Sequence, residues 1–320
     1  MGNIFKSLFS SSKEISKDEM AKSEQKKFDV LKYDGVRALK IGKLAYAIKC
    51  FIGALDLQED FETRTYLVTA YMAAHKLEEA LGELNQLVEL DPDHIQTRLS
   101  RINLLFMLDK ESEVEVDCLH IIGLDETNHL PWFLLGKAKR ALGNPLGAIA
   151  DLTKAIALNE SFIDVYLLRA EVLLAMGQAK EALLDVEKAL LLNPEEESSY
   201  LLRGCIQEAL GNWDAAAADY QNTLELNPFN EEAGLLTGRL LITQNRLDEA
   251  ICFFDELIEL KPELAKAYAE RGRAKNLKGD KVGAFEDLKK SIELNPTGDE
   301  AMRLEGQHSN FDNLYKGGIF

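Results

Sequence analysis

The sequence predicts an all-α protein, a solenoid of antiparallel helix hairpins, and three observations lead to this class. Prolines recur every 34 residues, at Pro194, Pro228, Pro262 and Pro296, and Pro92 precedes Pro194 by three such periods. Alanine recurs with the same period. Each period also holds one residue of a type that tolerates a left-handed backbone. A fixed period of this length indicates a repeat architecture in which similar units stack on one another.

Each repeat is interpreted as two helices once the recurring alanine is numbered position 20. Alanine fills it at Ala47, Ala80, Ala148, Ala182, Ala216, Ala250 and Ala284, and Val114 is the exception. Position 15 then holds Gly42, His75, Asp109, Gly143, Gly177, Gly211, Asn245 and Gly279. Glycine adopts positive φ freely, and Asn, Asp and His are enriched there. We therefore expect position 15 to end the first helix and the proline near position 32 to end the second.

Position 8 predicts how closely the two helices of a repeat approach. It holds a small residue in six repeats, namely Gly35, Gly136, Ala170, Gly204, Gly238 and Gly272. Small residues facing each other at positions 8 and 20 would let the helix axes come close together. Repeats 2 and 3 have Val68 and Ile102 at position 8, so we expect looser hairpins there.

This pattern resembles the tetratricopeptide repeat family, over about 271 of the 320 residues. Repeat 4 matches the family signature at Trp132, Leu135, Gly136, Gly143, Ala148, Leu152, Ala155 and Leu158. The resemblance implies eight repeats in a right-handed α-solenoid, a superhelix whose concave groove binds extended or helical peptide. The repeats are expected over residues 28–298. Residues 1–27 are expected to form a mobile N-terminal arm, and residues 299–320 a C-terminal capping helix and tail.

The resemblance places the partner-binding groove on the first helices. The apolar candidates are Leu99, Phe106, Phe133, Leu167, Leu174, Leu201 and Leu235, and the polar candidates are Asn103, Lys137, Arg140, Glu171 and Arg239. An apolar strip with both charge signs suits a protein or peptide with a few apolar anchors, such as an amphipathic helix. The alternative is that these side chains pack against their own neighbours. A carboxylate clamp for chaperone tails is not expected, because only Lys32, Asn103 and Lys266 match its pattern.

The sequence offers no catalytic, cofactor or metal motif. The histidines are far apart, no phosphate-binding glycine loop is present, and Cys118 falls at an apolar position. We therefore expect a non-enzymatic protein–protein interaction scaffold that needs no cofactor. The alternatives are a substrate-selecting or regulatory subunit of an enzyme complex, or a self-assembling adaptor, and a homo-oligomer is left open.

The charge and cysteine content bound the location and the partner. Lys and Arg number 37 against 54 Asp and Glu, a net charge of −17. Such an acidic surface disfavours nucleic acid and anionic lipid, and favours a partner with some basic character. Four scattered cysteines and the lack of a transmembrane segment predict a cytoplasmic protein. The alternative is peripheral membrane association through residues 1–9, where Ile4, Phe5, Leu8 and Phe9 form an apolar helical face.

Overall fold

The computed structural model describes residues 17–296, with side chains from residue 21 onward. Residues 1–16 of the expected arm and the expected cap at 299–320 lie outside the described residues. Within residues 17–296 the regular structure is helical: sixteen α-helices and one short 3₁₀ helix. Helix α1 begins at Lys17 and so runs eleven residues ahead of Phe28, the predicted start of the first repeat. The prediction of an all-α protein built from helix hairpins is confirmed.

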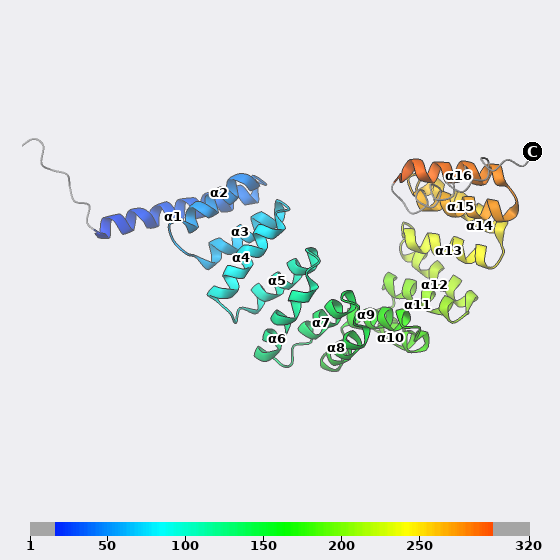
Figure 1. The fold of residues 1–320 in the computed structure, drawn as a ribbon, viewed down its shortest axis with the longest axis horizontal. Coiled ribbons are helices and arrows are strands. Elements are labelled where there is room, and N and C mark those ends of the chain that lie inside the picture. The colour runs from blue at the N-terminus through cyan, green and yellow to red at the C-terminus, as the bar shows by residue number, and fades with distance from the viewer. Residues whose placement is uncertain (1–16, 297–320) are drawn as a thin grey trace, which may run out of the picture. The chain divides into compact units, whose positions relative to one another are not determined.

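The chain divides into two compact units, one ending at Asn159 and the other beginning at Glu160. The helices of the N-terminal unit are α1 (Lys17–Lys40), α2 (Leu44–Leu55), α3 (Phe61–Ala73), α4 (Leu77–Leu90), α5 (Ile95–Met107), η1 (Glu111–Glu113), α6 (Val114–Leu124), α7 (Leu130–Ala141) and α8 (Pro145–Leu158) (Figure 1). Those of the C-terminal unit are α9 (Ile163–Ala175), α10 (Ala179–Leu192), α11 (Glu197–Ala209), α12 (Trp213–Leu226), α13 (Glu231–Thr243), α14 (Leu247–Leu260), α15 (Ala265–Lys278) and α16 (Lys281–Leu294) (Figure 1). Each odd-numbered helix packs against the even-numbered helix that follows it, which gives hairpins 1 to 8. No helix of residues 17–296 is both long and apolar enough to cross a membrane.

The turn inside each hairpin is set by the residue at position 15. All eight of these residues have positive φ: five glycines, together with His75 at 54°, Asp109 at 53° and Asn245 at 58°. The chain can reverse there because the left-handed conformation stops the first helix. The predicted end of every first helix is confirmed.

The helices of a hairpin approach closely at positions 8 and 20, as expected, and the side chain at position 24 packs on position 8 as well. In hairpin 8 the atom nearest to a Cβ on Gly272 would be the carbonyl oxygen of Ala284 at position 20, at 3.1 Å. A Cβ on Gly136 would lie 2.6 Å from Cγ of Leu152, at position 24, and 3.3 Å from the carbonyl oxygen of Ala148, at position 20. Gly35 likewise faces the ring of Phe51, and Gly204 faces Tyr220. The side chain at position 24 reaches across the helix interface, whereas the alanine at position 20 contributes mainly backbone.

Residue volumes at positions 8 and 24 vary in opposite directions. Hairpins with glycine at position 8 carry Phe51, Leu152, Tyr220, Phe254 or Leu288 at position 24. Hairpin 3 has Ile102 at position 8 and only Cys118 at position 24, and both are fully buried. In hairpin 3 a larger residue on one helix is therefore matched by a smaller one on the other, as close packing requires. Hairpin 2, with Val68 at position 8 and Leu84 at position 24, does not follow this trend. The helices α5 and α6 of hairpin 3 approach each other over fewer residues than the helices of any other hairpin, as expected, although the side chains at its centre, including Val114, are fully buried.

A second repeating pair joins the two helices through buried charge. Arginine at position 7 contacts aspartate at position 23, with N–O distances of 2.6 Å, in Arg101–Asp117, Arg169–Asp185, Arg203–Asp219 and Arg271–Asp287. In hairpin 4, Lys139 takes the same role and lies 2.6 Å from Asp151. These aspartates are buried, so each ion pair neutralises a carboxylate that would otherwise be costly to bury.

The side chain at position 4 ties a hairpin to the turn that precedes it. The hydroxyls of Tyr166 and Tyr268 donate to the carbonyl oxygens of Glu160 and Pro262, each at 3.2 Å. In hairpin 3, Nε of Arg98 donates to the carbonyl oxygen six residues earlier in the same way, at 2.7 Å. Position 4 therefore serves the packing of consecutive repeats.

Candidate functional site

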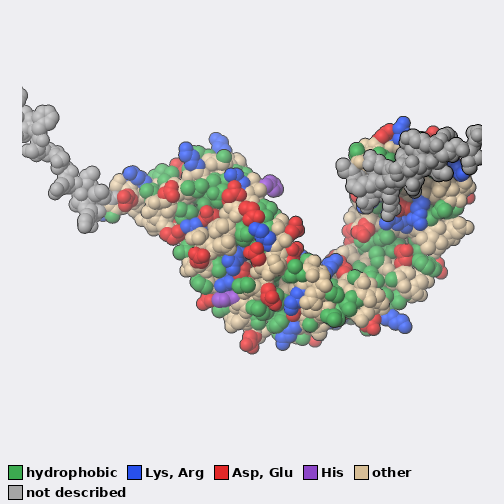
Figure 2. All heavy atoms as spheres, viewed as in Figure 1, with side chains coloured by type: hydrophobic (Ala, Val, Ile, Leu, Met, Phe, Trp, Pro, Cys, Tyr) green, Lys and Arg blue, Asp and Glu red, His purple; other side chains and the backbone are tan. Residues whose placement is uncertain are grey.

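In the N-terminal unit, the predicted groove residues lie on α5 and α7. Leu99, Phe106 and Phe133 are half-buried and pack against the hydrophobic core, whereas Asn103 is exposed. Nζ of Lys137 lies 4.4 Å from the centroid of the Phe106 ring, a cation–π contact that joins the two helices. Apolar, acidic and basic side chains are interspersed over this unit on the face shown in Figure 2.

The polar members of the predicted set are not equally accessible. In the N-terminal unit Lys137 and Arg140 are exposed, whereas in the C-terminal unit Glu171 and Arg239 are half-buried. Among the apolar members of the C-terminal unit, Leu167, Leu174 and Leu201 are half-buried and Leu235 is buried. Of these C-terminal residues, Leu235 and Arg239 line one hollow and the others lie outside it.

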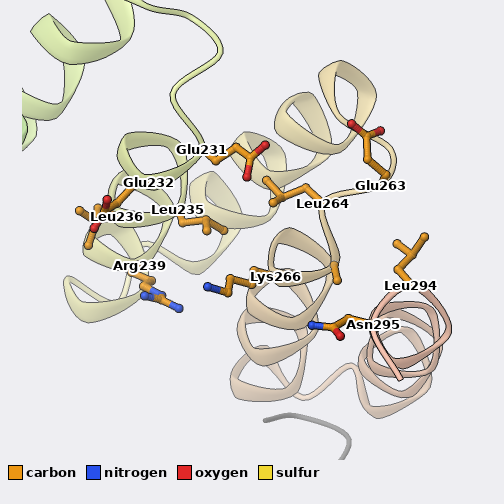
Figure 3. Close-up of a pocket in the computed structure, with 11 residues that line it drawn as sticks. Glu231, Glu232, Leu235, Leu236, Arg239, Glu263, Leu264, Lys266, Leu294 and Asn295 are labelled. Carbon is orange, nitrogen blue, oxygen red and sulfur yellow. The ribbon is translucent and has the colours of Figure 1, made fainter. Parts of the chain in front are cut away.

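This hollow lies between the first helices α13 and α15 and has a volume of about 600 Å³. Its lining residues are Glu231, Glu232, Leu235, Leu236, Arg239, Glu263, Leu264, Ala265, Lys266, Leu294 and Asn295 (Figure 3). The leucines supply apolar surface and the charged side chains surround it. Figure 3 shows Arg239 and Lys266 pointing toward the same space from α13 and α15.

Ion pairs already occupy two of the charged groups around the hollow. Nζ of Lys261 lies 2.7 Å from Glu231, and Nε of Arg239 donates to Glu270 at 2.6 Å. Within residues 17–296, Glu232, Glu263 and Lys266 have no ion-pair partner. Two carboxylates and one ammonium group are therefore available to a ligand in the hollow.

The walls of the hollow show what the sequence pattern missed. Glu263 and Leu264 come from the turn between α14 and α15, and Asn295 follows the end of α16. The groove positions implied by the family resemblance lie within first helices and do not include these residues. Nothing in the sequence distinguishes these residues from those at the same positions of other repeats, because only the packing of consecutive hairpins brings turn residues to the hollow.

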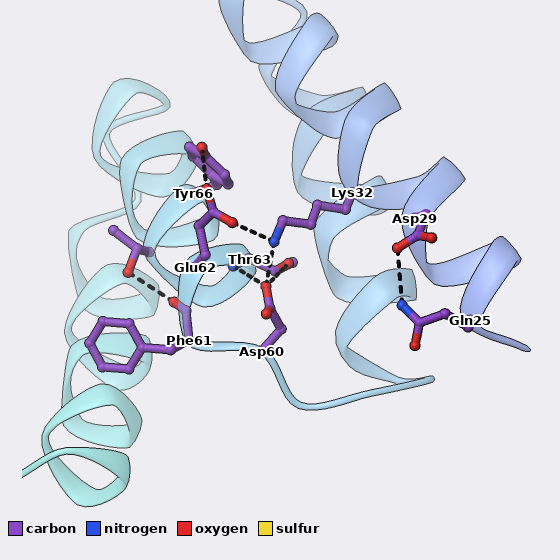
Figure 4. A network of polar contacts seen from close by, with 9 residues as sticks. Gln25, Asp29, Lys32, Asp60, Phe61, Glu62, Thr63 and Tyr66 are labelled. Atoms are coloured by element: carbon purple, nitrogen blue, oxygen red, sulfur yellow. Dashed lines mark hydrogen bonds and ion pairs between the residues drawn. The ribbon is translucent and has the colours of Figure 1, made fainter.

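Lys32 shows how a residue that matches a binding motif can be used within the fold. Its ammonium group donates to Asp60 at 2.9 Å and to Glu62 at 2.6 Å, and Glu62 also accepts from the hydroxyl of Tyr66 (Figure 4). Burial alone would lower the pKa of Lys32, but the hydrogen bonds that it donates to the two carboxylates, together with their charges, outweigh burial and raise it. Its charge is therefore held by α3 and by the residue before it.

The thiols of Cys118 and Cys205 are poor nucleophiles. Burial raises the pKa of Cys118 to about 12, and burial also raises the pKa of Cys205. A thiol with a raised pKa has little of the reactive thiolate at neutral pH. Within the described part of the chain, no group of three His, Cys, Asp or Glu side chains is arranged to hold a metal ion.

Comparisons with known proteins agree with this repeat geometry. The tetratricopeptide repeat family model matches residues 133–199 and 201–265. No curated protein matches the chain.

Two solved structures of tetratricopeptide repeat proteins share the fold. A tetratricopeptide repeat protein from Cytophaga hutchinsonii is 18% identical with a TM-score of 0.56, covering 76% of this chain and 98% of its own. One from Parabacteroides merdae is 16% identical with a TM-score of 0.52, covering 87% and 96%. YrrB, described as a TPR protein with an unusual peptide-binding site, is 25% identical with a TM-score of 0.45, covering 59% and 97%.

The family assignment follows from the periodic turns, the hairpin packing and the family-model match together. Proteins of this family mediate protein–protein interactions and are typically not enzymes. The chain is a tetratricopeptide repeat protein.

Proposed function

We propose that the chain is a non-enzymatic interaction scaffold that binds a peptide or helix of a partner protein along its first helices. The observation that carries the proposal is the hollow between α13 and α15, of about 600 Å³. Leu235, Leu236 and Leu264 give it apolar surface for an anchoring side chain, and the surrounding charges can orient the backbone that follows.

The charges of the hollow favour a partner segment with basic character. Glu232 and Glu263 are free to pair with Lys or Arg side chains that flank an apolar anchor, and Lys266 would repel a misplaced basic residue. The net charge of −17 acts in the same direction, because it attracts basic segments at long range.

The first-helix strip of the N-terminal unit is proposed as a further binding surface. Phe106 and Phe133 remain half-buried, so part of each ring is accessible to a ligand. Lys137 covers one of these rings, and a ligand would displace it or extend the contact. Asn103 on the same helix as Phe106 is exposed and could hydrogen-bond to a peptide backbone.

Peptide display against the full chain tests the proposed chemistry of the C-terminal hollow. Selection should enrich peptides that carry one or two large apolar residues flanked by Lys or Arg. Charge reversal at the free carboxylates, Glu232→Lys with Glu263→Lys, should weaken the selected peptides by about tenfold or more, because each exposed ion pair contributes up to about 1 kcal/mol and the new charges repel.

A matched control is the same reversal on the exposed side of a second helix, at Glu256 and Glu259 of α14. This variant changes the net charge equally and should leave binding within about twofold. Equal weakening by both double variants would show that only net charge matters, and selection of peptides without apolar anchors would contradict the role of the hollow.

A further inference from the structure

The first hairpin has an apolar hollow on its outer side. Its volume is about 570 Å³, and α1 and α2 line it with Ser23, Lys26, Lys27, Val30, Leu31, Gly53 and Leu57. Apart from Ser23 and the lysine ammonium groups, this lining is hydrocarbon. Val30 is 51% exposed and Leu57 is 41% exposed, so both present apolar surface to this hollow.

The repeat pattern shows that this surface is one that other hairpins cover. Position 3 is buried in each of hairpins 2 to 8, at Thr63, Thr97, Pro131, Val165, Ser199, Ala233 and Ala267. In hairpin 1, position 3 is the exposed Val30. Position 4 of hairpin 1 is Leu31, where Tyr166 and Tyr268 of later hairpins hydrogen-bond to a preceding turn. The described residues hold nothing that fills this role for α1.

We propose that residues 4–9 of the same chain occupy this hollow and cover the outer side of hairpin 1. On a helix, Ile4, Phe5, Leu8 and Phe9 share one face, because their spacing of four residues corresponds to about one turn. That face supplies apolar side chains that would fill the hollow and cover its apolar lining. The inference concerns hairpin 1 only and does not rest on peptide binding by α13 and α15.

The length of the connecting segment allows this contact. The centre of the hollow, near Val30, lies thirteen residues along α1 from Lys17, or about 20 Å at 1.5 Å per residue. Residues 10–16 can extend over about 23 Å, which is enough to bring residues 4–9 back along α1. A segment tethered this closely has an effective concentration on the order of millimolar, so a modest apolar contact keeps it bound.

The charge of the chain favours this occupant over an anionic membrane. Lys26 and Lys27 lie at the hollow, but the chain as a whole carries −17 and would be repelled by anionic lipid. The aliphatic stems of these lysines can pack on the rings of Phe5 and Phe9 while their ammonium groups stay in water.

Alkylation of a cysteine placed in the hollow tests the proposal. Leu57→Cys is introduced in the full chain, and its reaction with N-ethylmaleimide is followed by peptide mass spectrometry, so the native cysteines do not interfere. Adding Phe5→Ser with Phe9→Ser should speed this reaction about tenfold, which corresponds to about 1.4 kcal/mol of lost protection. The matched control, Lys6→Ser with Lys13→Ser, should change the rate less than twofold. Equal rates in all three proteins would overturn the proposal.

The same reporter distinguishes other occupants of the hollow. Protection by the chain's own segment is independent of protein concentration, and protection that grows with concentration would show that a second copy covers the hollow instead. Protection that appears only with vesicles of phosphatidylserine and phosphatidylcholine would show that a membrane does. As a direct measurement, oxidation of a Leu8→Cys, Leu57→Cys variant should give a disulfide within one chain, and a disulfide only between chains would overturn the assignment.

Discussion

The pairing of positions 8 and 24 predicts that Gly238 and Phe254 are energetically coupled. Phe254 is fully buried, and a Cβ on Gly238 would lie 2.6 Å from both Cε1 and Cε2 of its ring. Cζ of the ring would lie nearer still. Carbon atoms in contact are about 3.5–4.0 Å apart, so Gly238→Ala forces a shift of more than about 1 Å in a closed interior. Hairpin 5 avoids this conflict with Ala170 opposite Val186. We therefore expect Phe254→Val to make room for alanine at position 238.

The magnitude follows from three terms. Overpacking in Gly238→Ala costs about 1–3 kcal/mol, and replacing glycine by alanine inside a helix returns about 1 kcal/mol. Phe254→Val alone leaves a cavity, and it should cost less than the roughly 3–5 kcal/mol that is typical of Phe→Ala. In the double variant the overpacking disappears while the helix gain remains. The expected coupling energy is therefore about 1–3 kcal/mol in favour of the double variant.

Native-state hydrogen exchange of α13 and α14 is the appropriate assay, because a long repeat array need not unfold in one step. Gly234→Ala on the same helix is the control. Its Cβ would meet the side chain of Leu257, with the two methyl groups nearest at 3.1 and 3.2 Å, and a flexible leucine can give way, so this variant should be neutral or slightly stabilising. If the two changes at 238 and 254 add to within about 0.5 kcal/mol, the proposed volume matching is refuted.

Three further predictions concern charge, thiol and turn. Burial alone would raise the pKa of Asp287, but hydrogen bonds from its two basic partners lower it. The Asp287 carboxylate therefore stabilises the fold above its unfolded pKa of about 3.9, and this stabilisation is lost as pH falls through its folded pKa. The opening free energy of hairpin 8, measured by hydrogen exchange, should consequently depend less on pH in Asp287→Asn than in the unmodified chain. Cys118, with its pKa of about 12, should resist N-ethylmaleimide at pH 8 until urea unfolds the chain. The exposed Cys252 should react at once, and equal reaction rates of the two thiols in the native protein would contradict the burial of Cys118. At position 15, Gly177→Ala should lower the opening free energy of hairpin 5 by about 1–2 kcal/mol, because φ is 76° there. His75→Gly should leave the opening free energy of hairpin 2 unchanged or raise it, and native-state hydrogen exchange of each hairpin measures both effects.

The turns of the fold were predictable because one residue is enough to specify each of them. Gly177 or Asn245 at position 15 permits positive φ whatever the neighbouring hairpins do, and the structure has positive φ at both. The contact across the hairpin was less predictable. Position 20 stands out in the sequence because it is nearly always alanine, yet position 24 fills the interface, and its residue type changes from Phe51 to Cys118 with the partner at position 8.

Buried charge was missed for a related reason. Asp117, Asp151, Asp185, Asp219 and Asp287 recur at multiples of 34 residues, and this period was visible in the sequence. In so acidic a chain, carboxylates are expected at the solvated surface, and nothing in the period alone says which of them turn inward. The arginine sixteen residues earlier reveals this, because a buried carboxylate needs a compensating charge within contact distance.

The candidate site divides in the same way. The sequence pattern named Leu235 and Arg239 because they lie on a first helix at family groove positions, and both line the hollow between α13 and α15. It could not name Glu263 or Asn295, which reach that hollow from a turn and from the end of a second helix.

The sequence by itself determined the class of the protein, because a helix period, a turn residue and a repeat length are local properties written in consecutive residues. Only the tertiary structure decided which of these residues carry the packing and which remain available. The ammonium group of Lys32 is already held by Asp60 and Glu62, whereas Lys266, at a similarly favourable place in the pattern, is exposed beside a hollow. Whether a charged side chain is used by the fold or left to a partner depends on what lies within about 4 Å of it, and residues distant in sequence decide that.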